Sequence, residues 1–112
     1  MIKGLNMSEE SRRAKRFYGL KNATILDGDE RYPVILTSIS KSGISVMSEK
    51  SFPTFREITI EMELEGTKIE IKGSIRWVVE QPQKPKSPLK EIGVSIFNPP
   101  VSYLDYIGRI EE

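Results

Sequence analysis

The side chains that most often perform acid–base or metal chemistry are missing from this sequence. Its 112 residues include no histidine and no cysteine, which excludes imidazole bases, thiolate nucleophiles and zinc sites built from those ligands. Carboxylates, lysine, serine and tyrosine remain, but no acid–base pair at catalytic spacing is readable among them. We therefore expect a binding protein rather than an enzyme, with no metal site and no cofactor.

One cluster of cations has a spacing that suits anion binding. Arg12, Arg13 and Arg16 lie in the segment RRAKR, and a separation of four residues brings Arg12 and Arg16 to one face of a helix or of an extended chain. Guanidinium groups fork onto phosphates and onto the O6/N7 edge of guanine. Alone, such a cluster is more typical of a solvated basic arm, or of a weak contact with RNA or a membrane.

A second group of small polar residues lies where a predicted strand turns. Ser38, Ser40 and Gly43 fall in the segment SISKSG at 38–43. The serines supply hydroxyl groups, and Gly43 permits a positive φ or the close approach of a ligand. Taken alone, this segment is more typical of an ordinary turn.

Glycines inside two further predicted strands mark a third region. Gly73 and Gly93 each interrupt an apolar strand pattern, which indicates a bulge or a sharp bend of the kind a closing barrel needs. Trp77 follows Gly73 with the same alternation as Ile69 and Ile71. We therefore expect Trp77 to pack in the core.

A two-residue hydrophobic period predicts the strands that position these groups. The expected strands are 32–40, 43–48, 58–64, 69–79 and 91–97. A two-residue turn at Glu65-Gly66 would form a hairpin in which nearly every apolar residue faces an apolar partner. Glu61 opposite Glu70 is the one discordant pair in that register.

The predicted fold class is all-β: a small six-stranded antiparallel β-barrel with a basic N-terminal arm and one C-terminal helix. We assign residues 1–22 to the arm and 23–112 to the barrel with its helix. The segment 81–89 (QPQKPKSPL) reads as a loop, and the helix follows Asn98-Pro99-Pro100. The helical residues expected to face the barrel are Tyr103, Leu104, Ile107 and Ile110.

Overall charge and hydropathy limit the classes of partner that this protein is expected to bind. Seventeen Lys and Arg against sixteen Asp and Glu leave a net charge of +1, so a uniformly cationic coat is absent and no specific DNA or RNA partner is expected. No apolar run approaches the ~20 residues that cross a membrane, and the first residues do not form a signal peptide. We expect a cytoplasmic protein without membrane insertion.

The order of these motifs along the chain is more specific than any one motif. From Arg12 to about Ile110 the sequence resembles the PilZ domain family, bacterial receptors for cyclic di-GMP. The resemblance implies that the arginine arm folds over a barrel surface carrying the motif Asp/Asn-x-Ser-x-x-Gly. It assigns Arg12 and Arg16 to the arginine positions, with Arg13 as the extra arginine often found beside them.

The second family motif is carried by Ser40 and Gly43, with one departure. Ser38 stands where the family usually has Asp or Asn. An amide or carboxylate oxygen there accepts from guanine N1–H and N2–H, whereas a serine hydroxyl is shorter and cannot present two acceptor sites in a plane. The departure bears on affinity and not on the fold.

The resemblance implies a cyclic di-GMP receptor that reorders its arginine arm on binding and signals to an unidentified effector protein. Ser38 keeps open an alternative, a PilZ-like adaptor that has lost nucleotide binding and only contacts proteins. A third interpretation is a small barrel for single-stranded nucleic acid, because aromatic residues Phe17 and Tyr18 follow the basic cluster.

Overall fold

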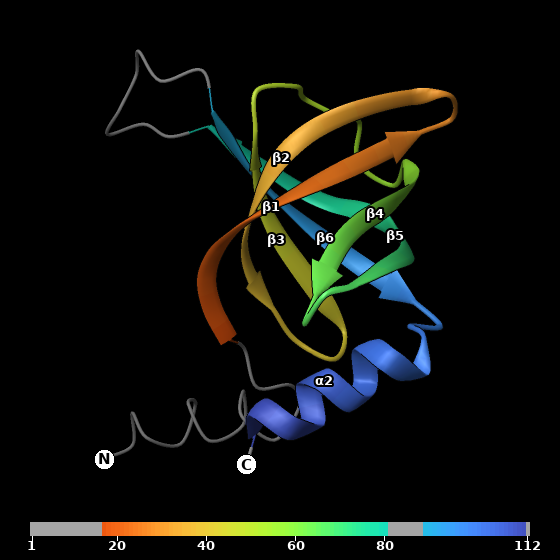
Figure 1. Ribbon diagram of the computed structural model, residues 1–112. Coiled ribbons are helices and arrows are strands. Elements are labelled where there is room, and N and C mark those ends of the chain that lie inside the picture. The colour runs from red at the N-terminus through yellow and green to blue at the C-terminus, as the bar shows by residue number, and fades with distance from the viewer. Residues whose placement is uncertain (1–16, 81–88, 112) are drawn as a thin grey trace, which may run out of the picture.

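The strands predicted from the alternating apolar residues close into a barrel, and one helix lies across an end of it (Figure 1). The computed structural model describes residues 17–80 and 89–111. Its elements are β1 (Phe17–Asp27), β2 (Glu30–Ile39), β3 (Gly43–Ser48), β4 (Glu57–Leu64), β5 (Thr67–Glu80), β6 (Lys90–Phe97) and α2 (Val101–Glu111). The strands follow the order β1-β2-β3-β6-β5-β4, and β1 pairs with β4 to complete the ring. The predicted fold class is confirmed.

The β4–β5 hairpin has the register that the sequence predicts. Met62 pairs with Ile69 and Ile60 pairs with Ile71, on either side of the Glu65-Gly66 turn. All four apolar side chains are at most 5% exposed. Because side chains alternate between the two faces of a strand, this register sends the apolar set into the barrel and the charged set outward.

The core is built mainly from β-branched residues that all six described strands send inward. Helix α2 adds Tyr103 and Ile107, both fully buried, to this core. Leu104 and Ile110 remain 40% and 37% exposed, so only half of the predicted apolar arc is covered by the barrel. The helix therefore lies against the end of the barrel along a narrow stripe (Figure 1).

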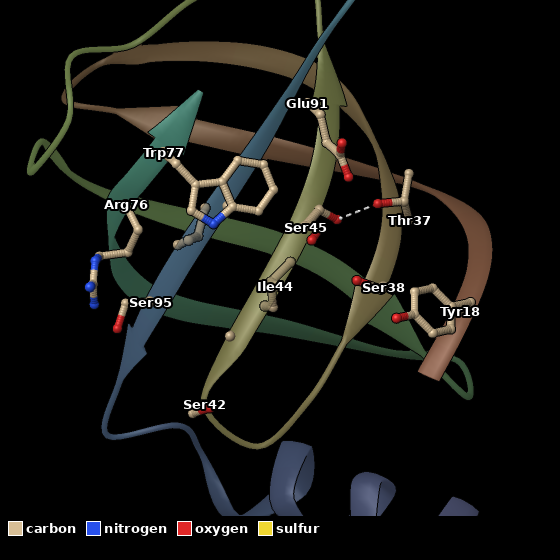
Figure 2. Close-up of a pocket in the computed structure, with 13 residues that line it drawn as sticks. Tyr18, Thr37, Ser38, Ser42, Ile44, Ser45, Arg76, Trp77, Glu91 and Ser95 are labelled. Carbon is tan, nitrogen blue, oxygen red and sulfur yellow. Dashed lines mark hydrogen bonds between the residues drawn. The ribbon is translucent and has the colours of Figure 1, made fainter. Parts of the chain in front are cut away.

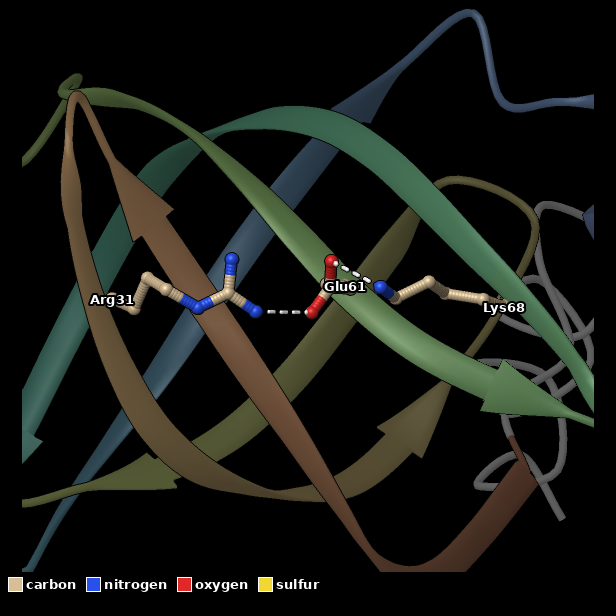
Figure 3. A network of polar contacts seen from close by, with 3 residues as sticks. All are labelled: Arg31, Glu61 and Lys68. Atoms are coloured by element: carbon tan, nitrogen blue, oxygen red, sulfur yellow. Dashed lines mark hydrogen bonds and ion pairs between the residues drawn. The ribbon is translucent and has the colours of Figure 1, made fainter.

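The discordant Glu61–Glu70 pair is present, and two cations compensate it (Figure 3). Arg31 Nη2 lies 2.6 Å from Glu61 Oε1, and Lys68 Nζ lies 3.3 Å from Oε2. Burial raises the pKa of Glu61, but the hydrogen bonds from Lys68 and Arg31 outweigh it, so the pKa lies below its ordinary value. The carboxylate is thereby kept charged at a site that is only 9% exposed.

The first strand begins earlier than the boundary drawn from the sequence. β1 starts at Phe17, inside the range 1–22 that was assigned to the arm, and Phe17 pairs with Ile39 of β2. The polar residues Lys21 and Asn22 obscured this start, because both lie in the strand where the apolar alternation is weak. Arg12, Arg13 and Arg16 lie outside the described residues, as does the predicted loop 81–89 except for Leu89.

Candidate functional site

Three strand pairs of the barrel depart from regular register. The shifts fall between Tyr18 and Lys21 in the β1–β2 pair, between Leu36 and Ser38 in β2–β3, and between Ile75 and Trp77 in β5–β6. The β1–β4, β3–β6 and β4–β5 pairs continue without a shift. Bulges re-aim side chains and are enriched beside functional sites. All three shifts here border a single pocket, which Tyr18, Ser38 and Trp77 help to line.

The bulge in β5 overturns the predicted core position of Trp77. Arg76 is the extra residue between Ile75, which pairs with Val94, and Trp77, which pairs with Gly93. The insertion reverses the alternation, so Ile75 is fully buried whereas Trp77 is 41% exposed. The expectation that Trp77 packs in the core was wrong.

The indole of Trp77 lies across the outer face of β6. A Cβ atom at Gly93 would stand 2.2 Å from Trp77 Cε2, far closer than two non-bonded carbon atoms can approach. Glycine is therefore required at position 93 for the indole to reach this place. The bulge or sharp bend predicted at Gly93 is not found in β6, which pairs with β3 there without a shift; the glycine instead allows a close approach of the ring to the backbone.

The pocket is a depression of about 690 Å³ on the outside of the barrel, within the size range of small-molecule sites. Its floor is made of small residues on β3 and β6: Gly43, Ser45, Gly93 and Ser95. Trp77 forms one wall, and Thr37, Ser38 and Tyr18 form the other (Figure 2). The small floor residues between the Trp77 and Tyr18 rings leave room for a flat ligand close to the backbone.

Two of the three second-motif residues line this pocket directly. Ser38 pairs with Ser45 of β3 and with Tyr18 of β1, and Gly43 opens β3 at the pocket floor. Ser38 contributes to the wall although the residue as a whole is only 3% exposed. The structure thus brings Ser38 and Gly43 to one site, as the sequence pattern indicates.

Ser40 serves the turn rather than the pocket surface. Its side chain is fully buried, and its Oγ accepts hydrogen bonds from the backbone N–H of Gly43 at 3.1 Å and of Ser42 at 3.3 Å. The Tyr103 hydroxyl of α2 donates to the Ser40 carbonyl at 2.6 Å. Ser40 therefore fixes the shape of the turn that presents Gly43, and α2 holds that turn from below.

The sequence pattern that defines the PilZ domain matches residues 10–110. This chain belongs to the PilZ domain family. The match covers the barrel, the helix and the arginine cluster together.

A solved structure supports the fold independently. This PilZ domain is similar to the inhibitor of motility MotI/DgrA of Bacillus subtilis, with a TM-score of 0.72 and 20% sequence identity. The similarity covers 89% of this chain and 51% of that one, so the chain spans about half the length of MotI/DgrA. No curated protein sequence matches it.

The described pocket of this PilZ domain is nearly neutral. Arg76 and Glu91 are the charged residues among those that line it within 17–80 and 89–111. In the same part of the chain, no group of three or more acidic side chains is arranged to hold a metal ion. No described helix is long and apolar enough to cross a membrane.

Sequence reasoning missed three large or charged residues of the pocket. Arg76, Trp77 and Glu91 line the pocket, yet none was selected as a site residue. The sequence held a signal for Arg76 and Trp77. Trp77 is followed by two valines, and this unbroken apolar run ends the strict alternation of β5. Such a break in a two-residue period indicates an inserted residue.

Proposed function

We propose that this PilZ domain is a cytoplasmic cyclic di-GMP receptor whose arginine arm reorders on binding and signals to an effector protein. It acts by binding and not by catalysis, and it needs no cofactor beyond its ligand. The observation that carries the proposal is the juxtaposition of Ser38 and Gly43 with the start of β1, which follows the arginine motif directly.

The length of the intervening chain supports this arrangement. Tyr18 pairs with Ser38 at the pocket wall, and Arg16 precedes Tyr18 by two residues and Arg12 by six. An extended chain spans at most ~3.6 Å per residue, so covalent connectivity limits the Cα–Cα separation from Tyr18 to about 22 Å for Arg12 and to about 7 Å for Arg16. The intervening chain is therefore short enough for the arginines of the motif to reach the pocket.

The arm would supply the positive charge that the described pocket lacks. Cyclic di-GMP carries two phosphate charges, whereas Arg76 and Glu91 nearly cancel within the described pocket. Arg12, Arg13 and Arg16 would supply the missing positive charge, and guanidinium groups can fork onto phosphates or onto the O6/N7 edge of guanine. Ordering an arm costs ~1–2 kcal/mol per residue, so contacts from the preformed pocket wall lower the total cost of binding.

Titration calorimetry with cyclic di-GMP tests the proposal. Arg12→Ala and Arg16→Ala should each abolish or strongly weaken binding, because each removes one forked contact. Lys15→Ala removes the same charge from the same segment, outside the arginine pattern, and should change affinity far less. Absence of heat at high micromolar ligand, with the protein folded, would reject the receptor function. Salt-dependent binding of any single-stranded oligonucleotide, with no preference for cyclic di-GMP, would favour a nucleic-acid barrel instead.

The second candidate function is a protein adaptor that no longer binds nucleotide, and Ser38 favours it. If the wild type gives no heat and Ser38→Asp binds cyclic di-GMP, the adaptor function replaces the receptor function. MotI/DgrA is named as an inhibitor of motility, which makes motility the first output to examine in cells that carry or lack this chain.

A further inference from the structure

Glu91 is the one acidic residue among the described residues that line the pocket. It lies on β6, two residues before Gly93, and pairs with Met47 of β3 and Val79 of β5. It therefore shares the outer face of β6 with the Gly93 floor. Figure 2 shows its carboxylate between the Trp77 indole and Thr37, on the pocket side of the sheet.

The Glu91 carboxylate is available to a ligand. Its side chain is partly exposed, and the polar contacts of residues 17–80 and 89–111 give it no ion pair, in contrast to Glu61 with Arg31 and Lys68. A lone carboxylate beside a dianionic ligand opposes binding through charge repulsion. Its place in this pocket is favourable only if the ligand offers it hydrogen-bond donors.

We infer that Glu91 is a specificity-determining residue that accepts hydrogen bonds from the N1–H and N2–H edge of a guanine base. The inference rests on the proposed function. A carboxylate presents two coplanar oxygens and only accepts, which matches two neighbouring donors. Ser38 cannot make this paired contact, so the acceptor role lies on the other side of the pocket in this chain.

The neighbouring Trp77 sets the plane of such a base. Its indole lies flat enough over β6 to contact the Gly93 backbone, and 41% of the residue remains exposed. Aromatic faces of this kind stack against nucleobases. A base lying against Trp77 presents an edge towards Glu91, which is the adjacent outward residue on β6.

Adenine would make an unfavourable contact with Glu91. It presents a ring-nitrogen acceptor where guanine presents the N1–H donor, and two acceptors facing each other repel. Glu91 should therefore make the pocket prefer cyclic di-GMP over cyclic di-AMP. A good paired contact of this type corresponds to a difference of about ten- to a hundredfold in affinity.

The test is calorimetric titration of the full chain with cyclic di-GMP and with cyclic di-AMP. Glu91→Gln keeps the size of the side chain but replaces one acceptor by a donor. It should weaken cyclic di-GMP binding by about tenfold or more and narrow the preference over cyclic di-AMP. Glu63→Gln is the matched control, because it removes the same charge from β4, which contributes no described residue to the pocket. It should change neither affinity.

A double variant sharpens the result. Ser38→Asn restores the acceptor usual in the family, and in the Glu91→Gln background it should recover the guanine preference. Unchanged or tighter cyclic di-GMP binding by Glu91→Gln would overturn the inference and leave the receptor function standing. Equal weakening of both nucleotides would also overturn it, because Glu91 would then act on the arm rather than on the base. If the wild type binds neither nucleotide, the receptor function and the inference fail together.

Discussion

Strand β5 has two halves that do different work. From Thr67 to Ser74 it pairs with β4 without a shift, and its inward residues enter the core. Beyond Ile75 an inserted residue turns Arg76 and Trp77 outward beside β6. The regular half serves stability, whereas the bulged half forms the pocket wall. The other two shifted pairs also border the pocket, although its floor comes from the regular β3–β6 pair.

Among substitutions that test this difference between the two halves, the largest loss of stability is expected in the regular half. Ile71 is 1% exposed in the core, so Ile71→Ala leaves a cavity and should lower the free energy of unfolding by about 2–5 kcal/mol. Urea denaturation followed by circular dichroism measures the change. Glu63→Ala, an exposed position on β4, should stay within about 0.5 kcal/mol of the wild type. Equal losses for the two variants would contradict the assignment of this half to the core.

On the bulged half, Gly93→Ala should affect both stability and the pocket. The added Cβ would overlap the Trp77 ring, so the indole must move or β5 must separate from β6. We expect a loss of about 1–3 kcal/mol, together with weaker ligand binding by calorimetry. Gly108→Ala in α2 is the control, because nothing lies within 4 Å of a Cβ there. It should raise stability by about 0.5–1 kcal/mol through helix propensity. A Gly93→Ala variant as stable as the wild type would mean that the indole is not held as described.

The turn that presents Gly43 distinguishes a structural serine from a ligand-binding one. Ser40→Ala removes the acceptor of two backbone N–H groups and should cost about 1–2 kcal/mol of stability. Ser42→Ala, whose side chain is exposed in the same turn, should cost less than about 0.5 kcal/mol. A Ser40→Ala variant with full stability but lost binding would instead assign this hydroxyl to the ligand.

The smallest effect concerns the charged face of the regular half. Because the folded pKa of Glu61 lies below its ordinary value of 4.5, its ion pairs stabilise the fold above that value. The contribution is lost as the pH falls through the folded pKa. The melting-temperature difference between wild type and Glu61→Gln should therefore be largest near neutral pH and shrink in acid. A difference that persists unchanged at low pH would show that Glu61 acts by packing alone.

The sequence predicted best where local pattern and pairing agree. In the β4–β5 hairpin the alternation and the turn both fix one register, and that register was confirmed. Strand β1 (Phe17–Asp27) was not among the strands expected by range, because Lys21 and Asn22 interrupt the apolar period where the strand is exposed. The SISKSG segment was located correctly as a turn beside a strand end. The division of labour between Ser38 and Ser40 depends on which hydroxyl points into the turn, and spacing alone does not specify that.

The pocket walls were the hardest part to predict. An inserted residue exchanges the two faces of a strand, and a period count carried through it gives the wrong face for every later residue. Trp77 was placed in the core for this reason, although Arg76 is the only insertion needed to turn it outward. Besides the apolar run that follows Trp77, a second signal could have corrected the error: Trp77 and Gly93 lie on different strands and have complementary sizes.

The placement of Trp77 has a practical consequence. It is the single tryptophan of the chain, and it lies 41% exposed in the wall of the pocket. Indole emission responds to the polarity of its surroundings, so a ligand that covers the ring should change the intrinsic fluorescence of the protein. The domain thus carries a built-in optical probe at the position where binding is expected, and no label has to be attached.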